Sequence, residues 1–322
     1  MNAPELVDPA APSRVLVIHN PASGRGRGER VARELSEALI ASGARVDALA
    51  TDPEASGYRT VRAEDYDDLA VVGGDGTLHV TLNELAGARG PVLFAGTGTV
   101  NVIGLEYRLP RDPAALVELR TRGRVARLPL LECNSRLAVL FAEAGFLARV
   151  VERVNDARAR GSRHGKSAFV WAGLRTVLTS WGRPLVARGR TVAGDAFAIR
   201  CSNALATKAR LYGGTMPMPI DAAIPYPLEE DSFELVLFRS RTPLGHALLL
   251  ALGNLRLLPA LRGVLEKLGL LTSLRVSAVT IEGPEDTDAH VDAETEFPGG
   301  ERLRLPLEVR TGERSLELFV PR

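Results

Sequence analysis

Cysteine is scarce in this chain of 322 residues, which contains only Cys133 and Cys201. Two cysteines cannot build the disulfide framework of a small secreted protein, so a reducing, cytoplasmic setting is expected. An excess of charge of one sign is lacking too, because 40 basic and 39 acidic residues leave a net charge of +1. No nucleic-acid partner is therefore expected, since nucleic-acid-binding proteins usually present a strongly basic face.

An uninterrupted apolar run long enough to span a bilayer is also missing. The longest apolar region, 242–271, is broken by polar and charged residues such as Arg256, Arg262 and Lys267. A transmembrane helix needs about 20 mostly apolar residues, so no transmembrane segment is expected. Residues 1–13 lack the basic start and apolar centre of a signal peptide and are expected to form a flexible N-terminus.

The most informative stretch of the sequence is Leu69–Leu78, with the sequence LAVVGGDGTL. A strand-like apolar run ends there in three glycines, one carboxylate and one threonine, and a helical pattern follows. The N-terminus of a helix offers unpaired N–H groups that suit phosphate. A carboxylate beside a phosphate repels it unless a cation intervenes or a proton moves. Asp75 is therefore a candidate for chemistry in a nucleotide site.

The first 123 residues alternate strand-like and helix-like segments. This alternation predicts a parallel sheet with helices on both faces, in which ligands bind beyond the carboxyl ends of the strands. Polar or glycine-rich segments follow each of the four predicted strands: Asn20–Gly24, Thr51, Gly73–Thr77 and Gly98–Asn101. Since these segments would meet at one edge of the sheet, they predict a shared binding site.

Beyond Arg124 the pattern changes to short strand-like runs, which predict an antiparallel β domain. Its helical inserts are expected at 150–181 and 243–271. A hairpin through Cys133-Asn134-Ser135 is expected to join strands at 124–132 and 136–143. The other expected strands are 185–192, 196–203, 233–239, 274–282, 290–295, 303–309 and 316–320.

The ordered set of motifs resembles bacterial lipid kinases of the diacylglycerol kinase catalytic-domain family, which are related to sphingosine and ceramide kinases. The matching segments are Asn20-Pro21-Ala22-Ser23-Gly24, Gly73-Gly74-Asp75-Gly76-Thr77, Gly98-Thr99-Val100-Asn101, Gly213-Gly214-Thr215, Asp231 and Asp292-Ala293-Glu294. The resemblance implies a phosphofructokinase-like, three-layer α/β domain at 14–123, to which 303–322 return. It implies a β-sandwich lipid domain with helical inserts at 124–302.

The resemblance also implies ATP as the phosphate donor and a lipid hydroxyl as the acceptor. The residues expected to bind ATP are Asn20, Ser23, Gly24, Thr51, Gly73, Gly74, Asp75, Gly76, Thr77, Thr99 and Asn101. Asp231, with main-chain oxygens of Leu228 and Phe233, is expected to bind a regulatory Mg²⁺, since oxygen ligands suit this ion. From the residues alone, this segment also fits a simple acidic turn.

For the catalytic base the resemblance favours Glu294, with Asp292 and Asp75 as alternatives. Asp292 and Glu294 alternate along a strand-like segment, so both are expected to face one side. Paired carboxylates raise each other's pKa, which helps one of them to accept a proton. A solvated acidic strand face is the other interpretation of this segment.

The chain departs from the family pattern at Val102, Ser232 and Ala293, where many members have Asp, Gly and Gly. These departures leave open a nucleotide-binding regulator without turnover. A kinase of a soluble substrate is a further alternative, because NAD kinases share the glycine-aspartate loop. The expected partner is a lipid at a membrane surface, reached from the cytoplasmic side. Open strand edges in the second domain leave a homodimer possible.

Overall fold

The computed structural model describes residues 13–52, 56–85, 90–159, 166–179, 183–297 and 301–322. The N-terminus predicted to be flexible, 1–13, lies outside these residues except for Ser13. The chain forms two compact units. The first comprises Met1–Gly98, Arg108–Ala126 and Glu317–Arg322; the second comprises Thr99–Tyr107 and Arg127–Leu316.

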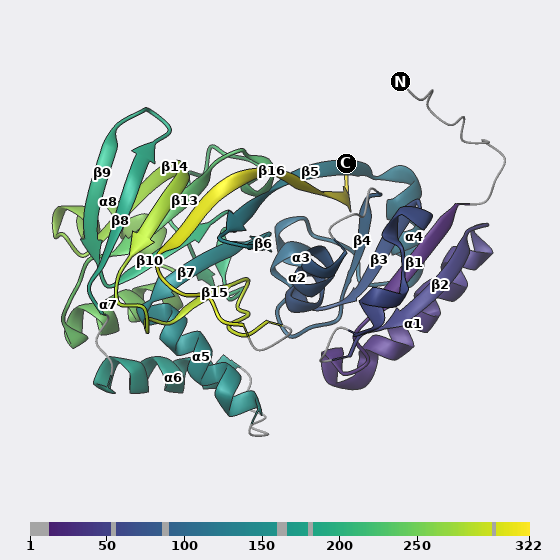
Figure 1. Ribbon diagram of the computed structural model, residues 1–322, viewed down its shortest axis with the longest axis horizontal. Coiled ribbons are helices and arrows are strands. Elements are labelled where there is room, and N and C mark those ends of the chain that lie inside the picture. The colour runs from purple at the N-terminus through teal and green to yellow at the C-terminus, as the bar shows by residue number, and fades with distance from the viewer. Residues whose placement is uncertain (1–12, 53–55, 86–89, 160–165, 180–182, 298–300) are drawn as a thin grey trace. The chain divides into compact units, whose positions relative to one another are not determined.

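A parallel sheet forms the centre of the first unit (Figure 1). Its strands follow the order β16, β4, β3, β1, β2, and each neighbouring pair is parallel. Their bounds are β1 Arg14–His19, β2 Arg45–Ala50, β3 Asp68–Gly73, β4 Val92–Gly96 and β16 Leu307–Val320. Because all strands run the same way, the carboxyl ends of β1, β3 and β4 meet at one edge, as the sequence predicts.

Helices cover both faces of this sheet because its inner strands are apolar on both sides. Helices α1 (Ser23–Ala41) and α4 (Pro113–Arg122) pack against one face and bury Leu35, Leu39 and Leu116. Helix α2 (Asp75–Glu84) contacts β3 and buries Leu78. Two short 3₁₀ helices, η1 (Ser56–Thr60) and η2 (Ala63–Asp65), connect β2 to β3.

The second unit is built on antiparallel strands, in the order β15, β7, β10, β13, β14, β16. The hairpin β8–β9 joins it at β14, and the hairpin β5–β6 at β16. The bounds are β5 Arg124–Cys133, β6 Arg136–Ala138, β7 Phe141–Gly145, β8 Leu185–Thr191, β9 Ala196–Cys201, β10 Asn203–Thr207, β11 Leu211–Tyr212, β12 Met216–Pro217, β13 Phe233–Phe238, β14 Leu271–Glu282 and β15 Ala289–Val291. The prediction of an α/β region followed by an antiparallel β region is therefore confirmed.

The helices of the second unit lie between its strands in sequence. They are α3 Val102–Glu106, α5 Phe146–Ala159, α6 Lys166–Thr179, the 3₁₀ helix η3 Pro227–Glu229, α7 Pro243–Asn254 and α8 Leu258–Lys267. Each predicted helical insert is thus a pair of helices. Within the described residues, every helix is too short or too polar to cross a membrane.

Four strand predictions need correction. The run 196–203 is divided at Ser202 between β9, which ends at Cys201, and β10, which begins at Asn203. The run 136–143 is interrupted between β6 and β7, and the run 290–295 ends as a strand at Val291. The runs 303–309 and 316–320 form one strand, β16, which belongs to the second unit as far as Leu316. The return to the first unit therefore begins at Glu317 instead of residue 303.

Candidate active site

The turns that follow the strands of the first unit are joined by main-chain hydrogen bonds. The carbonyl oxygen of Gly73 accepts from the N–H groups of Thr97 (2.7 Å) and Gly98 (3.3 Å), so the turn after β3 is tied to the turn after β4. At the next strand, the N–H of Asn20 donates to Val72 (3.0 Å). The N–H of Thr51 donates to His19 (2.8 Å), which places the turn after β2 beside the turn after β1.

Gly73 is required where β3 meets α2. A Cβ atom at this position would lie 2.3 Å from Oγ1 of Thr77, and such a separation is far shorter than van der Waals contact. Asp75 is the first residue of α2, so its carboxylate lies in the first turn, at the positive end of the helix. The turn therefore places a carboxylate and a buried threonine, Thr77, next to main-chain N–H groups.

The turn after β1 packs against the turn after β4. The hydroxyl groups of Ser23 and Thr97 lie 2.6 Å apart, and a Cβ atom at Gly24 would lie 2.4 Å from the carbonyl oxygen of Thr97. Gly24, Arg25 and Gly26 all have left-handed backbones, with φ of 58°, 63° and 83°. Such a conformation strains a non-glycine residue, and strained residues cluster at ligand sites. Thr97 is not among the predicted site residues, because the matching motif begins at Gly98.

Thr99 and Asn101, the remaining predicted nucleotide ligands, belong to the second unit. Thr99 is exposed, and Asn101 is buried with a left-handed backbone (φ 56°) immediately before α3. Val102 is buried as well. The end of α3 is held by Glu106, whose carboxylate accepts a hydrogen bond from the N–H of Arg210 (2.6 Å). Burial raises the pKa of Glu106, and its bonds to Arg210 oppose the shift.

Asp292 and Glu294 do not alternate along a strand, which corrects the prediction that they face one side. Asp292 and Ala293 both have left-handed backbones, with φ of 49° and 69°. They form a tight turn, closed by hydrogen bonds between Val291 and Glu294 in both directions (3.2 and 2.8 Å). Asp292 is buried and Glu294 is half-buried, so the turn gives the two carboxylates different environments.

The carboxylate of Asp292 accepts main-chain hydrogen bonds of the kind that a neighbouring strand would accept. Its oxygens accept the N–H groups of Val139 (2.8 Å), Leu140 (2.9 Å) and Phe141 (3.0 Å). These bonds fill the gap between β6 and β7, which explains why the predicted strand is interrupted there. Three main-chain donors on its two oxygens hold this carboxylate in one orientation. This geometry fits a positioning role for Asp292.

Replacing Ala293 by glycine is expected to stabilise the protein by about 1 kcal/mol, because glycine adopts a positive φ without the penalty that a Cβ atom brings. The free energy of unfolding in urea measures this change. Gly263→Ala is the control, because Gly263 is an exposed helical position with open space around it and lies outside any turn. An unchanged or lower stability for Ala293→Gly would contradict a strained turn.

A buried polar network fixes the strand that leads into this turn. Glu143 on β7 is fully buried, and its carboxylate accepts from Asn203 Nδ2 (2.7 Å) and from the hydroxyl of Tyr212 (2.6 Å). His290 Nε2 on β15 lies 3.0 Å from the same carboxylate. Burial, followed by the charge of Glu143, raises the pKa of Tyr212 far above its ordinary value, so its phenol stays protonated. Glu143 is not among the residues predicted from the sequence, although a single carboxylate within an apolar strand indicates a buried polar network.

The segment predicted to bind a regulatory Mg²⁺ is surrounded by positive side chains. The Asp231 side chain is 83% exposed and lies 4.0 Å from Arg127, and the neighbouring Glu230 pairs with Arg275 at 3.0 Å. Lys208 is buried nearby; burial lowers its pKa to about 8, and Asp231 and Glu230 oppose the shift.

No set of three His, Cys, Asp or Glu side chains in the described ranges is placed to hold a metal ion. Leu228 lies in η3 and Phe233 begins β13, so both predicted main-chain ligands flank Asp231 in sequence. Asp231 is the one side chain in the predicted ligand set, and the Mg²⁺ site there stays a prediction.

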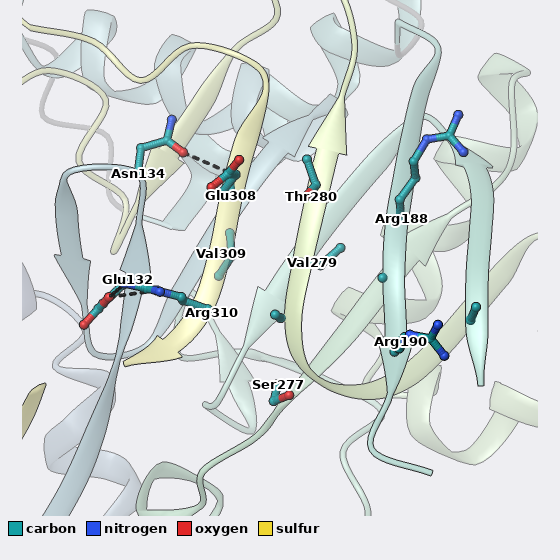
Figure 2. A pocket seen from close by; sticks show the side chains of 13 residues that line it. Glu132, Asn134, Arg188, Arg190, Ser277, Val279, Thr280, Glu308, Val309 and Arg310 are labelled. Atoms are coloured by element: carbon teal, nitrogen blue, oxygen red, sulfur yellow. Dashed lines mark hydrogen bonds and ion pairs between the residues drawn. The ribbon is translucent and has the colours of Figure 1, made fainter. Parts of the chain in front are cut away.

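A hollow of about 760 Å³ lies elsewhere in the second unit, over β8, β14 and β16 (Figure 2). Among its charged side chains, Arg310 pairs with Glu132 (2.7 Å) and Arg188 pairs with Glu282 (2.9 Å). None of the residues predicted for catalysis, nucleotide binding or metal binding lines this hollow. It is therefore not assigned to the candidate site.

Comparison with known proteins shows a family match in the first part of the chain. Residues 14–133 match the family described as the diacylglycerol kinase catalytic domain. The match covers 120 of the 322 residues, so it shows similarity to that family in this part of the chain. It includes the motifs at Asn20, Asp75 and Asn101, whereas Asp231, Asp292 and Glu294 lie beyond it.

Relatives of the diacylglycerol kinase catalytic domain occur among bacterial proteins. The chain is 31% identical over 144 residues to a diacylglycerol kinase of Staphylococcus carnosus, and 33% identical over 147 residues to one of Staphylococcus aureus. These matches cover 42% of this chain and 46% and 45% of the relatives, so the chain aligns with less than half of each.

Similarity of fold extends further than similarity of sequence. A crystal structure of a diacylglycerol kinase from Bacillus anthracis matches with a TM-score of 0.65 at 15% identity, covering 96% of both chains. Another structure from the same organism, assigned to the same class, gives 0.71 at 18% identity and covers 98% of both. At these identities the match establishes the fold of the whole chain.

Proposed function

We propose that this chain is an ATP-dependent lipid kinase that transfers the γ-phosphate to a hydroxyl of diacylglycerol or a related lipid. The observation that carries the proposal is the meeting of three turns, Asn20–Gly24, Gly73–Thr77 and Thr97–Gly98, at one sheet edge. All three lie within the residues that match the diacylglycerol kinase catalytic domain. Their main-chain N–H groups and hydroxyls suit the phosphates of ATP.

In this proposal the lipid hydroxyl oxygen attacks the γ-phosphorus, and the bond from that phosphorus to the β-phosphate oxygen breaks. ADP leaves, and the hydroxyl proton passes to Glu294, which we assign as the base. Asp292 positions the turn that carries Glu294, since its carboxylate is held by three N–H groups. Mg²⁺ accompanying ATP would neutralise charge on the phosphates, and Asp75 is the residue that we assign to it.

Phosphotransfer itself is the direct test. Purified protein with γ-labelled ATP and Mg²⁺ is expected to label a lipid extracted into organic solvent, first of all diacylglycerol. NAD is offered in a parallel reaction. Labelling of NAD with no labelled lipid would replace the proposal by a soluble-substrate kinase. ATP binding in calorimetry, without transfer to any acceptor, would replace it by a non-catalytic regulator.

Asp75→Asn is expected to lower kcat about 10²-fold, because the Mg²⁺ ion that would neutralise the phosphates loses the carboxylate assigned to it. Thermal stability should change little, since asparagine keeps the shape of aspartate and the lost helix N-terminal charge is worth roughly 0.5 kcal/mol. Initial rates at several Mg²⁺ concentrations measure the effect. The same substitution at Asp112, which caps α4 by accepting from Ala115 N (3.0 Å), is the control. Full turnover by Asp75→Asn would remove Asp75 from the mechanism.

Gly73→Ala is expected to weaken ATP binding about tenfold or more, because the new Cβ atom forces Thr77 and the start of α2 away from the turn. Calorimetric titration with ATP measures the change, and Gly263→Ala provides an unhindered glycine-to-alanine control. An unaltered affinity would mean that ATP does not contact this turn.

A further inference from the structure

Apolar side chains are unusually exposed on α7 and on α8 with its preceding loop. On α7 and just after it, Leu244 is 80% exposed and Leu255 is 66% exposed. Leu248 and Ala251 are exposed as well, so the four lie on one helical face. At and beyond the start of α8, Leu257, Val264 and Leu268 are exposed. We call these residues the leucine surface.

The opposite face of α7 is anchored, so the helix cannot rotate to bury its leucines. His246 and Leu249 are fully buried, and His246 Nε2 lies 2.8 Å from the hydroxyl of Ser202. Gly253 faces Met216 so closely that an added Cβ atom would lie 2.6 Å from its sulfur. The exposure of Leu244 and Leu255 is therefore imposed by the packing of the rest of the helix.

Helix α8 is anchored in the same way. Leu258 and Leu265 are buried. The guanidinium of Arg262 lies 3.4 Å from Glu234 and 3.2 Å from Glu266. Consecutive helices thus each bury one face and leave an apolar stripe in solvent. Contiguous exposed apolar surface on a soluble protein marks an interaction site.

The charge around the leucine surface is strongly positive. Segment 239–271 contains five basic residues and one carboxylate, giving a net charge of +4 against +1 for the whole chain. The carboxylate, Glu266, is paired with Arg262. The other basic residues are exposed and form no ion pair with the residues that the structure describes: Arg239, Arg241, Arg256 and Lys267. A second copy presenting the same +4 surface would be repelled, whereas an anionic bilayer would be attracted.

We propose that the leucine surface docks on an anionic phospholipid bilayer, with its leucines among the acyl chains and its basic side chains at the headgroups. The proposal deepens the proposed function by naming where the chain meets its lipid, and in that sense rests on it. Docking itself needs neither ATP nor catalysis, so it can be measured separately.

Co-sedimentation with vesicles tests the proposal. Wild-type protein is expected to bind vesicles of phosphatidylcholine with 30% phosphatidylglycerol (a chosen composition) and to bind pure phosphatidylcholine weakly. Leu244→Ser/Leu255→Ser should weaken binding to the anionic vesicles about tenfold or more. Arg241→Gln/Arg256→Gln should weaken it roughly 25-fold, at about fivefold per lost charge, and added salt should shrink the effect.

The matched control is Ile40→Ser/Val192→Ser, which removes two exposed apolar side chains away from α7 and α8, 57% and 58% exposed. Its binding should stay within about twofold of wild type. Absence of vesicle binding by wild type, or equal losses in control and leucine variants, would overturn the proposal. The proposal would also be overturned if the wild-type protein were a dimer and Leu244→Ser/Leu255→Ser were a monomer that still bound vesicles.

A kinase readout separates this proposal from the proposed function. Phosphorylation of a short-chain lipid in detergent micelles should be unchanged in Leu244→Ser/Leu255→Ser, while phosphorylation of lipid in vesicles falls with binding. Vesicle binding that follows the leucine surface, with no phosphotransfer by wild type, would refute the kinase and leave the docking surface standing.

Discussion

Replacing Glu294 by glutamine is expected to lower kcat for lipid phosphorylation about 10³-fold, within the range that a positioned general base contributes. Glutamine has the shape of glutamate but cannot accept the hydroxyl proton. The turn should survive, because it is closed by main-chain bonds between Val291 and Glu294 that the substitution leaves in place. KM for ATP and thermal stability should therefore stay near their wild-type values. Initial rates at saturating ATP and lipid measure the effect.

Glu296→Gln is the matched control, because Glu296 lies two residues further on, is exposed, and only approaches Arg302 at 3.9 Å. It should retain near wild-type turnover. Equal rates for Glu294→Gln and wild type would move the base to Asp292 or Asp75. Between these two, Asp75→Asn would then have to show the loss, since the Asp292 carboxylate is occupied by three N–H groups.

The nucleotide half of the candidate site could be predicted because it depends on local signals. The inner strands β1, β3 and β4 are apolar runs, and each is followed by glycine or polar residues. Parallel strands bring these ends together without further information. What the local pattern could not give is the contact between turns, such as the Ser23–Thr97 hydroxyl pair, which joins residues 74 positions apart.

The second half resisted prediction because its determinants are non-local. The sequence 290–295 alternates like a strand, yet Asp292 binds N–H groups about 150 residues earlier in the chain. These three hydrogen bonds lie where β15 ends and where β6 is separated from β7. They also bury Asp292, whereas Glu294 is half-buried. Similarly, residues 311–314 are polar and suggested a break, but they continue β16 as one strand. The hydrophobic period of a segment indicates which of its faces is apolar. It does not indicate which distant residues the segment will contact.

Asp292→Ala is expected to destabilise the protein by about 4 kcal/mol, the largest effect on stability that we expect from one substitution. The change removes the acceptors of three buried N–H groups, those of Val139, Leu140 and Phe141. Each unsatisfied buried donor costs roughly 1–3 kcal/mol, and partial relaxation toward water recovers some of that cost. Urea unfolding followed by far-ultraviolet circular dichroism measures the loss.

Asp221→Ala is the control, because Asp221 is exposed and its carboxylate accepts a single N–H, that of Ala223 (2.9 Å). It should cost about 1 kcal/mol or less. Asp292→Asn should fall between the two alanine variants: its one carbonyl oxygen can still accept from Leu140 and Phe141, while its amide nitrogen faces the N–H of Val139. Turnover should follow the same order, because the turn that carries Glu294 loosens as the bonds to Asp292 are lost. A stable but inactive Asp292→Ala would reverse this assignment, since it would mean that the Asp292 carboxylate takes part in the chemistry.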